Sequence, residues 1–191
     1  NFPELVPLIS HSVSPMIMTA QLIKHSDPTA KVVFIGPCAS KKAEFKLEKT
    51  GGAIDCVMSF EELQAFLDAR GIDTVDCEDT ELDHGSFYGR IFAKSGGIVQ
   101  GLQDVAKDLN VEGLKPIVMS GIDECRANLT KLKFGKATEN FFEGMACEGG
   151  CLNGPLCITH SPRNIVDVDK FGNEAKEKTI YNSVKLYENT K

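Results

Sequence analysis

Three short apolar runs, rich in β-branched residues, place the strongest constraint on the fold of this chain. They are AKVVFIG at 30–36, AIDCVMS at 53–59 and KPIVMSG at 115–121. Continuous apolar runs of this length are typical of strands buried on both faces of a parallel sheet. Helical patterns follow the second and third runs, and strands that alternate with helices predict a parallel α/β fold. We therefore expect an α/β protein with short parallel β-sheets flanked by helices.

Helix-boundary signals are clearest after the second run. Ser59 is the predicted N-cap, Glu62 stands three residues further on as in a capping box, and Gly71 follows the predicted end. The other helices are expected at 2–9, 14–25, 95–109, 124–135 and 177–191.

Length and composition exclude several classes of protein. The chain has 191 residues, 42% of them hydrophobic, enough for one sizeable core or two small lobes. Its net charge of -6 argues against a nucleic-acid surface, which usually needs a basic stripe. No apolar run approaches the roughly 18 residues of a membrane span, and no signal-peptide pattern opens the chain. We expect a cytoplasmic protein and, because the chain opens on Asn1 inside an amphipathic segment, a piece of a longer one.

Cys147 and Cys151 carry the first chemical signal. An odd number of cysteines, seven, disfavours a disulfide framework and favours free thiols or metal ligands. The C-x-x-x-C spacing predicts two sulfur atoms on one face of a helical turn, where both can reach one metal centre. Gly149 and Gly150 between them are poor helix-interior residues. Glycine is expected there if an inorganic group or another backbone approaches closely.

Cys38 carries the second signal, because it follows a predicted strand and the Gly36-Pro37 pair. Ligands of open α/β sheets bind outside the carboxyl ends of strands. Lys41 and Lys42 would favour the thiolate of Cys38. The alternative is a loop cysteine beside two solvated lysines, and this segment alone leaves both interpretations open.

Three thiolates are one ligand short of the four that zinc or a [4Fe–4S] cluster takes. The fourth would lie upstream of Asn1 or be Cys125 or Cys157, each of which is also explained by a structural role. Cys56 is expected to be a small buried apolar residue, and Cys77 to be incidental in an acidic loop. No paired metal-ligand spacing is found among the histidines, which are His11, His25, His84 and His160.

Two stretches resemble signatures of the iron-only ([FeFe]) hydrogenases. GPCASKKAE at 36–44 resembles the second signature, P-C-x-x-K-x-x-E, and FFEGMACEGGCLNG at 141–154 resembles the third, E-x-M-A-C-x-G-G-C-x-x-G. Residues 2–15 resemble the segment after the first signature, and residues 95–102 the glycine-rich stretch between the other two. The resemblance implies that residues 1–191 are the C-terminal part of a two-lobed H-cluster domain, truncated upstream and possibly downstream.

The resemblance also implies the cofactor. The family's H-cluster is a [4Fe–4S] cluster joined through one cysteine to a diiron unit that carries CO and cyanide. By motif position, Cys38, Cys147 and Cys151 would be ligands, with Cys151 bridging to the diiron unit. The fourth ligand would precede Asn1, so we expect this chain alone to lack a complete cluster.

Four further roles follow by resemblance. Lys41 would donate hydrogen bonds to a cyanide of the diiron unit, as suits a charged donor and an anionic ligand. Glu44 would orient Lys41, Met145 would pack against the diiron unit, and Ser10 occupies the place of a serine in the family's proton path. Lys42 is expected to be a solvated surface residue.

The chain departs from the catalytic members around these ligands. Gly36 stands where they usually have methionine, Met16 where they have glutamine, Pro155 where they have glycine and Gln100 where they often have glutamate. Groups around a metal site tune potential and proton access, and the changed set resembles the family's sensory branch.

Three functions therefore stand as hypotheses. The first is reversible reduction of protons to H2, as an enzyme or a low-turnover H2 or redox sensor, served by a ferredoxin-like donor or upstream iron–sulfur domains and by hydrogenase maturation proteins. The second is an iron–sulfur carrier or assembly protein without the diiron unit. The third is a metal-free α/β interaction domain.

Overall fold

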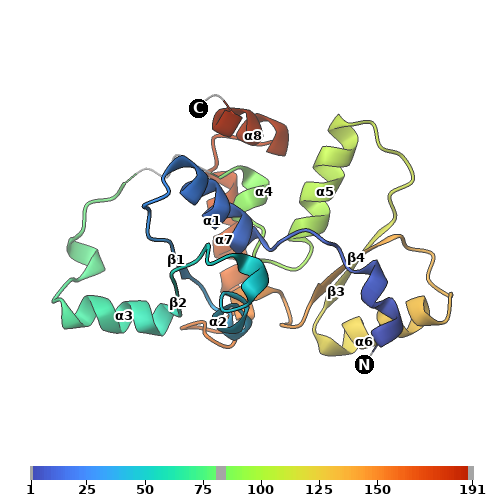
Figure 1. Cartoon of the computed structure of the whole chain (residues 1–191), viewed down its shortest axis with the longest axis horizontal. Helices are drawn as coiled ribbons and strands as arrows, with labels where there is room; N and C mark the ends of the chain where they lie inside the picture. The colour runs from blue at the N-terminus through green and yellow to red at the C-terminus, as the bar shows by residue number, and fades with distance from the viewer. Residues whose placement is uncertain (1, 81–84, 189–191) are drawn as a thin grey trace. The chain divides into compact units, whose positions relative to one another are not determined.

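A computed structural model describes residues 2–80 and 85–188 of the chain, the side chains of 186–188 excepted (Figure 1). The chain divides into two compact units. Unit 1 comprises residues 1–4, 79–153 and 160–191, and unit 2 comprises residues 5–78 and 154–159. Each unit holds a two-stranded parallel sheet, so the prediction of an α/β fold with short parallel sheets among helices is confirmed.

In unit 2, strands β1 (Val33–Ile35) and β2 (Cys56–Met58) form the sheet. Helix α1 (Pro15–Ser26) begins at a proline, as expected for a first-turn position, and covers one face of the sheet. Its Ile17 is 1% exposed. The core between helix and sheet consists of Met16, Ile17, Ala20, Ala53, Ile54 and Val57, with Val32, Phe34 and Phe45 packed against it.

The other face of this sheet is uncovered within the described residues. Val33 is 47% exposed and Ile35 40% exposed, and Cys56, the register partner of Val33, is exposed as well. The expectation of strands buried on both faces is therefore wrong for β1, and the expected burial of Cys56 is wrong with it. The physical reason is that α1 packs on the face formed by Phe34 and Val57, and residues alternate between the two faces of a strand.

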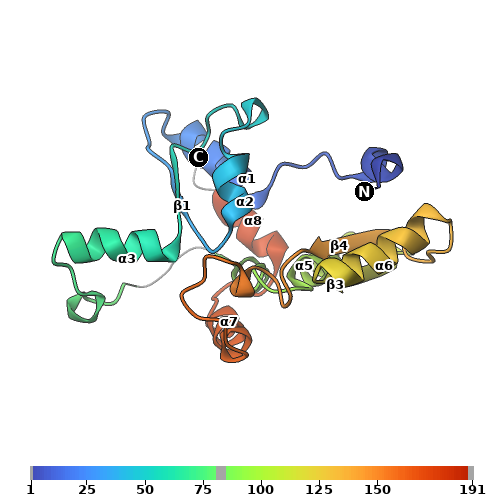
Figure 2. The ribbon, with the colours of Figure 1, turned by 90° about the horizontal axis from the view of Figure 1, so that it is seen from below.

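Helix α3 (Phe60–Ala69) confirms the predicted capping box. The Ser59 hydroxyl accepts a hydrogen bond from the Glu62 backbone N–H at 3.1 Å, and the Glu62 carboxylate accepts one from the Ser59 N–H at 2.7 Å. The helix extends away from β1 (Figure 2) and buries none of its residues, with Phe66 49% exposed. Unit 2 also contains α2 (Ala39–Glu44), η2 (Glu48–Thr50) and η3 (Thr74–Asp76).

In unit 1, strands β3 (Pro116–Ser120) and β4 (Phe141–Met145) form the second parallel sheet, beside α5 (Gly97–Asp108) and α6 (Ile122–Lys133). Sequence patterns did not indicate β4, because Glu143 and Gly144 interrupt its apolar residues. The remaining helices of the unit are α4 (Phe87–Arg90), η4 (Cys151–Asn153), α7 (Arg163–Asn173) and α8 (Ile180–Glu188).

The expected helix at 2–9 is a 3-10 helix, η1 (Pro3–Leu8), with Pro7 inside it. The expectations at 95–109, 124–135 and 177–191 correspond to α5, α6 and α8, whereas α2, α4 and α7 were not expected. Across the residues that the structure describes, no helix has the length and apolar character needed to cross a membrane.

Asp55 links three parts of unit 2 next to β2. Its carboxylate accepts a hydrogen bond from the Val32 backbone N–H at 2.8 Å and forms ion pairs with Lys24 of α1 at 2.9 Å and with Lys31 at 3.3 Å. The backbone hydrogen bond, followed by the one from Lys24, lowers the pKa of Asp55 to about 2. The carboxylate thereby joins α1 to the entry of β1.

We predict that Asp55→Asn lowers the free energy of unfolding near neutral pH and that the difference from the wild type disappears in acid. A carboxyl group whose folded pKa is lowered stabilises the fold above its ordinary pKa of 3.8, and this contribution is lost as pH falls through about 2. Urea denaturation at several pH values measures it. Asp76→Asn, at an exposed carboxylate of the same unit, is the control, and equal effects of the two substitutions at every pH would contradict the prediction.

Candidate metal centre

Cys38 lies at the carboxyl end of β1, as the sequence predicted. The Gly36 N–H donates to the Met58 carbonyl at 3.0 Å and extends the β1–β2 pairing by one residue. The chain then turns at Pro37, and Cys38, with extended backbone dihedrals, is the N-cap of α2. Its thiol is half-buried and free. The end of a parallel strand therefore presents a sulfur atom at the edge where such sheets bind ligands.

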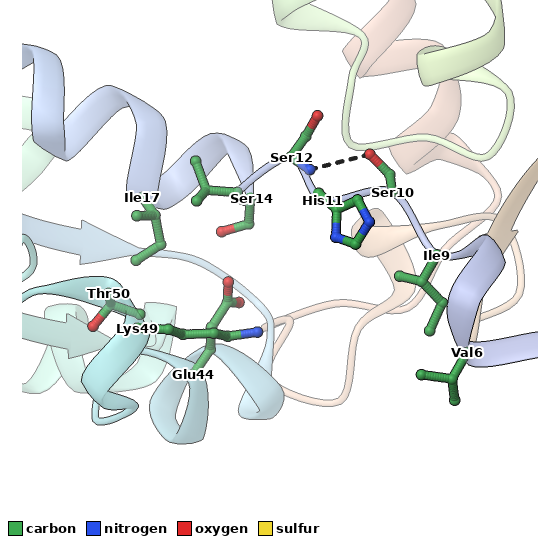
Figure 3. A pocket seen from close by; sticks show the side chains of 11 residues that line it. Val6, Ile9, Ser10, His11, Ser12, Ser14, Ile17, Glu44, Lys49 and Thr50 are labelled. Atoms are coloured by element: carbon green, nitrogen blue, oxygen red, sulfur yellow. Dashed lines mark hydrogen bonds between the residues drawn. The ribbon is translucent and has the colours of Figure 1, made fainter. Parts of the chain in front are cut away.

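Lys41 and Glu44 form an ion pair one turn further along α2. The Lys41 ammonium and the Glu44 carboxylate are 2.5 Å apart, and each side chain is about three-quarters buried. Burial raises the pKa of Glu44, but the hydrogen bond from Lys41 and the nearby Ser14 hydroxyl outweigh it, so the net pKa lies below the ordinary value. The buried Ser14 hydroxyl faces the carboxylate without strict hydrogen-bond geometry (Figure 3). The expected pairing of Glu44 with Lys41 is thus present.

Lys42 has a separate partner. Its ammonium group lies 2.5 Å from the Glu62 carboxylate at the start of α3, and both side chains are substantially exposed. The two neighbouring lysines therefore serve different places: Lys41 faces Glu44 within α2, and Lys42 joins α2 to α3.

Ser10 and Glu44 line one cleft of about 650 Å³ in unit 2 (Figure 3). The cleft lies between the extended segment before α1 and the chain around α2 and η2. The Ser10 hydroxyl accepts a hydrogen bond from the Ser12 N–H at 3.2 Å. Two predicted site residues that are far apart in the sequence are thereby brought to one solvent-accessible space. The other residues along it are Val6, Ile9, His11, Val13, Ser14, Ile17, Lys49 and Thr50.

Cys147 and Cys151 lie on a tight turn that follows β4 in unit 1. The predicted helical turn is wrong: residues 146–149 form a bend and a turn, and η4 begins only at Cys151. The reason lies in Gly149 and Gly150, whose φ angles of 77° and 98° are left-handed. We call residues 147–151 the cysteine turn.

Residues 93–95 run antiparallel to the cysteine turn and touch it along the backbone. Lys94 and Gly150 form an isolated bridge, the Ser95 N–H donates to the Gly149 carbonyl at 3.0 Å, and the Cys151 N–H donates to the Ala93 carbonyl at 2.7 Å. A Cβ atom on Gly150 would lie 2.5 Å from the Ser95 nitrogen and 2.6 Å from the Ala93 oxygen. Close approach of another backbone, one of the two reasons predicted for glycine here, is confirmed.

The end of β3 supplies a second contact. The Ser120 hydroxyl accepts a hydrogen bond from the Gly149 N–H at 2.8 Å and another from the Ser95 hydroxyl at 3.2 Å. Met145 is the register partner of Ser120, and its carbonyl accepts from the Gly121 N–H at 2.8 Å. Met145, predicted as a site residue, therefore ends β4 two residues before Cys147, and its side chain is half-buried.

The environment of Cys125 opposes an activated thiolate. Cys125 lies in the first turn of α6, where a dipole-stabilised thiolate was possible, but burial and then the charge of Glu124 raise its pKa. Its sulfur lies near the carbonyls of Met119 and Met145. Cys77 is exposed beside η3, and Cys157 is half-buried in unit 2. His84 lies outside the described residues.

The donor set agrees chemically with an iron–sulfur cluster. Soft thiolate ligands select such clusters, zinc or copper(I), and glycine around two of the thiols leaves room for a bulky inorganic group. Neither unit by itself, within the described residues, brings together three metal-ligating His, Cys, Asp or Glu side chains. Cys38 belongs to unit 2, and Cys147 and Cys151 belong to unit 1.

Comparison with known proteins names the family to which this α/β chain belongs. Residues 1–155 match the family model "Iron only hydrogenase large subunit, C-terminal domain". The chain belongs to this family, and the predicted resemblance is confirmed.

Curated relatives include two hydrogenases. Iron hydrogenase 1 of Clostridium pasteurianum is 27% identical over 88% of this chain and 37% of its own length. The periplasmic [Fe] hydrogenase large subunit of Nitratidesulfovibrio vulgaris is 28% identical over 80% of this chain and 47% of its own length. The cytosolic Fe-S cluster assembly factor NAR1 of Kluyveromyces lactis is 38% identical over 37% of this chain. The chain thus spans less than half the length of these two curated hydrogenases.

Solved structures share the fold. A variant of [FeFe]-hydrogenase HydA1 from Chlamydomonas reinhardtii aligns with a TM-score of 0.70 at 19% identity, over 98% of this chain and 66% of that one. The structure of HydA(deltaEFG) aligns with a TM-score of 0.68 at 20% identity, over 98% of this chain and 67% of that one. About a third of each solved chain has no counterpart in residues 1–191.

We predict that Gly150→Ala destabilises the protein far more than Gly113→Ala. Both glycines have left-handed φ angles, but a Cβ atom on Gly113 meets nothing within 4 Å, whereas one on Gly150 meets backbone at 2.5 Å. Backbone strain of about 1–2 kcal/mol applies to both substitutions, and the clash applies only to Gly150. Free energies of unfolding from urea denaturation, differing by more than about 2 kcal/mol, are expected. Equal values would show that the cysteine turn does not need this close approach.

Proposed function

We propose that residues 1–191 contribute Cys38, Cys147 and Cys151 as three ligands of the [4Fe–4S] cluster in the H-cluster of an [FeFe] hydrogenase. The observation that carries the proposal is the cysteine turn. Two left-handed glycines and two backbone hydrogen bonds to residues 93–95 hold Cys147 and Cys151 half-buried at the end of a parallel strand. A structural cysteine would not need this local geometry, whereas a pair of ligands for one centre does.

A covalent restraint supports the inclusion of Cys38. The Leu156 N–H donates to the Pro37 carbonyl at 3.2 Å, next to Cys38. Leu156 follows Cys151 by only five residues. A chain of that length spans at most about 18 Å when fully extended. The chain thus limits how far Cys151 can lie from the loop that carries Cys38, which is compatible with one cluster for both; we propose that the thiols of Cys38, Cys147 and Cys151 meet there.

The rest of the domain, including the fourth ligand, lies outside residues 1–191 in this proposal. Parallel sheets are normally covered on both faces, yet one face of β1–β2 is exposed and α3 buries no residue. About a third of each solved relative has no counterpart in the chain. We propose that this missing part covers the open face and completes the cluster site.

The cluster, when bound, supplies electrons and a metal site for the interconversion of protons and H2. The chain's own residues bind and orient it. Lys41, held by Glu44, offers a charged donor for an anionic ligand, which strengthens such a hydrogen bond roughly twofold over a neutral donor. Met145 adds a polarizable apolar side chain beside Cys147. Ser10 lines an open cleft, which supports its proposed part in a proton path to solvent.

We favour a low-turnover enzyme or a sensor over a fast hydrogenase. Gly36 stands at a position where the catalytic members of the family usually carry methionine. A Cβ atom on Gly36 would lie 2.8 Å from the ring of Phe34. A longer side chain at position 36 therefore requires the Phe34 ring to move. The packing of Phe34 thus supports glycine in place of methionine next to the Cys38 loop.

An iron–sulfur assembly role is the second candidate. It rests on the 38% identity with the assembly factor NAR1 over 37% of this chain. The two hydrogenases match longer stretches of the chain, but at lower identity. Such a protein would carry the cluster ligands without a diiron unit. The expected partners differ between the two candidate functions. A hydrogenase or sensor would use a ferredoxin-like donor or iron–sulfur domains and hydrogenase maturation proteins, whereas an assembly protein would bind cluster recipients. Free thiols suit a cytoplasmic location for both.

The cluster prediction is tested in the intact protein that carries residues 1–191, produced with the maturation proteins. Iron is expected in excess of acid-labile sulfide, because the diiron unit adds iron to the equal amounts in a [4Fe–4S] cluster. Cys38→Ser, Cys147→Ser and Cys151→Ser should each lower the iron content severalfold. Cys77→Ser, at an exposed cysteine, should leave the iron content unchanged. Infrared bands of metal-bound CO and cyanide are expected, and a cluster without those bands would favour the assembly role.

We also predict that Lys41→Ala lowers retention of the diiron unit, whereas Lys42→Ala does not. Both substitutions remove a lysine from α2 and break an ion pair, but only Lys41 pairs with Glu44 beside the cleft. The measurement is the intensity of the CO and cyanide bands relative to the iron of the [4Fe–4S] cluster. Equal loss in both variants would mean that Lys41 acts only through the stability of α2.

A further inference from the structure

Glu143 is a buried acidic residue for which the proposed chemistry has no use. It lies in β4, four residues before Cys147, and is only 2% exposed. Its two carboxylate oxygens accept hydrogen bonds from the backbone N–H groups of Gly96 at 2.7 Å and Val99 at 2.8 Å. Burying a carboxylate is unfavourable unless such bonds replace water, so the placement calls for a reason.

The reason lies at the start of α5. Gly96 is the N-cap of that helix with a φ of 87°, and it has no side chain to accept a hydrogen bond from the first turn. A usual capping box satisfies the N–H of the N-cap and the N–H three residues later by two separate side chains. Here both N–H groups are satisfied by one carboxylate from another strand, which also places negative charge at the positive end of the helix.

Residues 93–96 connect this cap to the cysteine turn. The Gly97 N–H donates to the Lys94 carbonyl at 3.0 Å, and Ala93 and Ser95 hold Cys151 and Gly149 by backbone hydrogen bonds. A Cβ atom on Gly97 would lie 2.5 Å from the Ile91 carbonyl oxygen, so this connection is tightly packed. Residues 93–96 are also anchored to α7, because Lys94 forms an ion pair with Asp169 of that helix. The position of the turn therefore depends on where α5 begins.

We propose that Glu143 is a positioning residue that holds the cysteine turn in place by capping α5 from β4. Its carboxylate ties the start of α5 to the strand that leads into Cys147, so that residues 93–95 meet Gly149, Gly150 and Cys151 in register. The inference deepens the proposed function, because the turn it positions is the one that would carry two cluster ligands. Glu143 itself touches no ligand atom in this role.

Amide hydrogen exchange of the 191-residue chain tests the positioning without any metal. Glu143→Ala is expected to increase exchange at residues 93–99 and 149–151 about tenfold or more, as loss of a hydrogen bond to a charged group predicts, with little change in β1 and β2 of unit 2. Glu143→Gln keeps one acceptor oxygen and is expected to show a smaller increase. Glu112→Gln, at an exposed residue between α5 and β3, is the matched control and should change nothing.

A second measurement separates positioning from a purely structural role. In the intact matured protein, Glu143→Ala should lose iron to a chelator severalfold faster than the wild type, and Glu143→Gln should restore part of the difference. If the wild type takes up no iron and sulfide, the proposed function fails, and the exchange data still decide the role of Glu143. Unchanged exchange at residues 149–151 in a folded Glu143→Ala protein overturns the proposal. Should that variant not fold, equal exchange in Glu143→Gln and wild type overturns it.

Discussion

Close approach of two backbone segments at Gly150 is the constraint on which the candidate site depends. Residues 93–95 and the cysteine turn exchange hydrogen bonds on both sides of Gly150, where there is no room for a side chain. The contact explains why two consecutive glycines with left-handed φ angles stand between the two cysteines. It also draws on the ends of three elements: β3 through Ser120, α5 through its N-terminus, and β4 through the chain leading into Cys147. A turn that is otherwise loop-like becomes a defined support for two sulfur atoms.

The two units share one arrangement, in which a cysteine follows the carboxyl end of a short parallel strand. Each ends a short parallel strand at an edge and places thiol chemistry directly after it, Cys38 after β1 and Cys147 after β4. A carboxylate also joins neighbouring elements in each unit: Asp55 joins α1 to the entry of β1, at the opposite end of the strand from Cys38, and Glu143 joins β4 to α5. The uncovered face of β1–β2 marks the difference between them, because the covering helix α1 lies on one side only.

Sequence reasoning succeeded where local chemistry decides the outcome. The capping box of Ser59 and Glu62 and the parallel pairing of β1 with β2 follow from short-range pattern and are present. It failed where a distant segment decides. The C-x-x-x-C spacing indicated a helical turn, but the approach of residues 93–95 imposes left-handed glycines instead. Strand β4 was hidden because its buried Glu143 looks like a surface residue until α5 is seen to cover it.

The sequence by itself determined the class of fold and the family signatures, with three cysteines among their residues, because apolar periodicity and motif spacing are properties of neighbouring residues. Only the tertiary structure decided how Gly149 and Gly150 are used, which partner Glu143 has, and that Ser10 and Glu44 share one cleft. These relations join residues tens of positions apart, and they depend on backbone hydrogen bonds and van der Waals distances that no local pattern encodes. The spacing of the cysteines is fixed by the chain, whereas the geometry of the cysteine turn arises from packing.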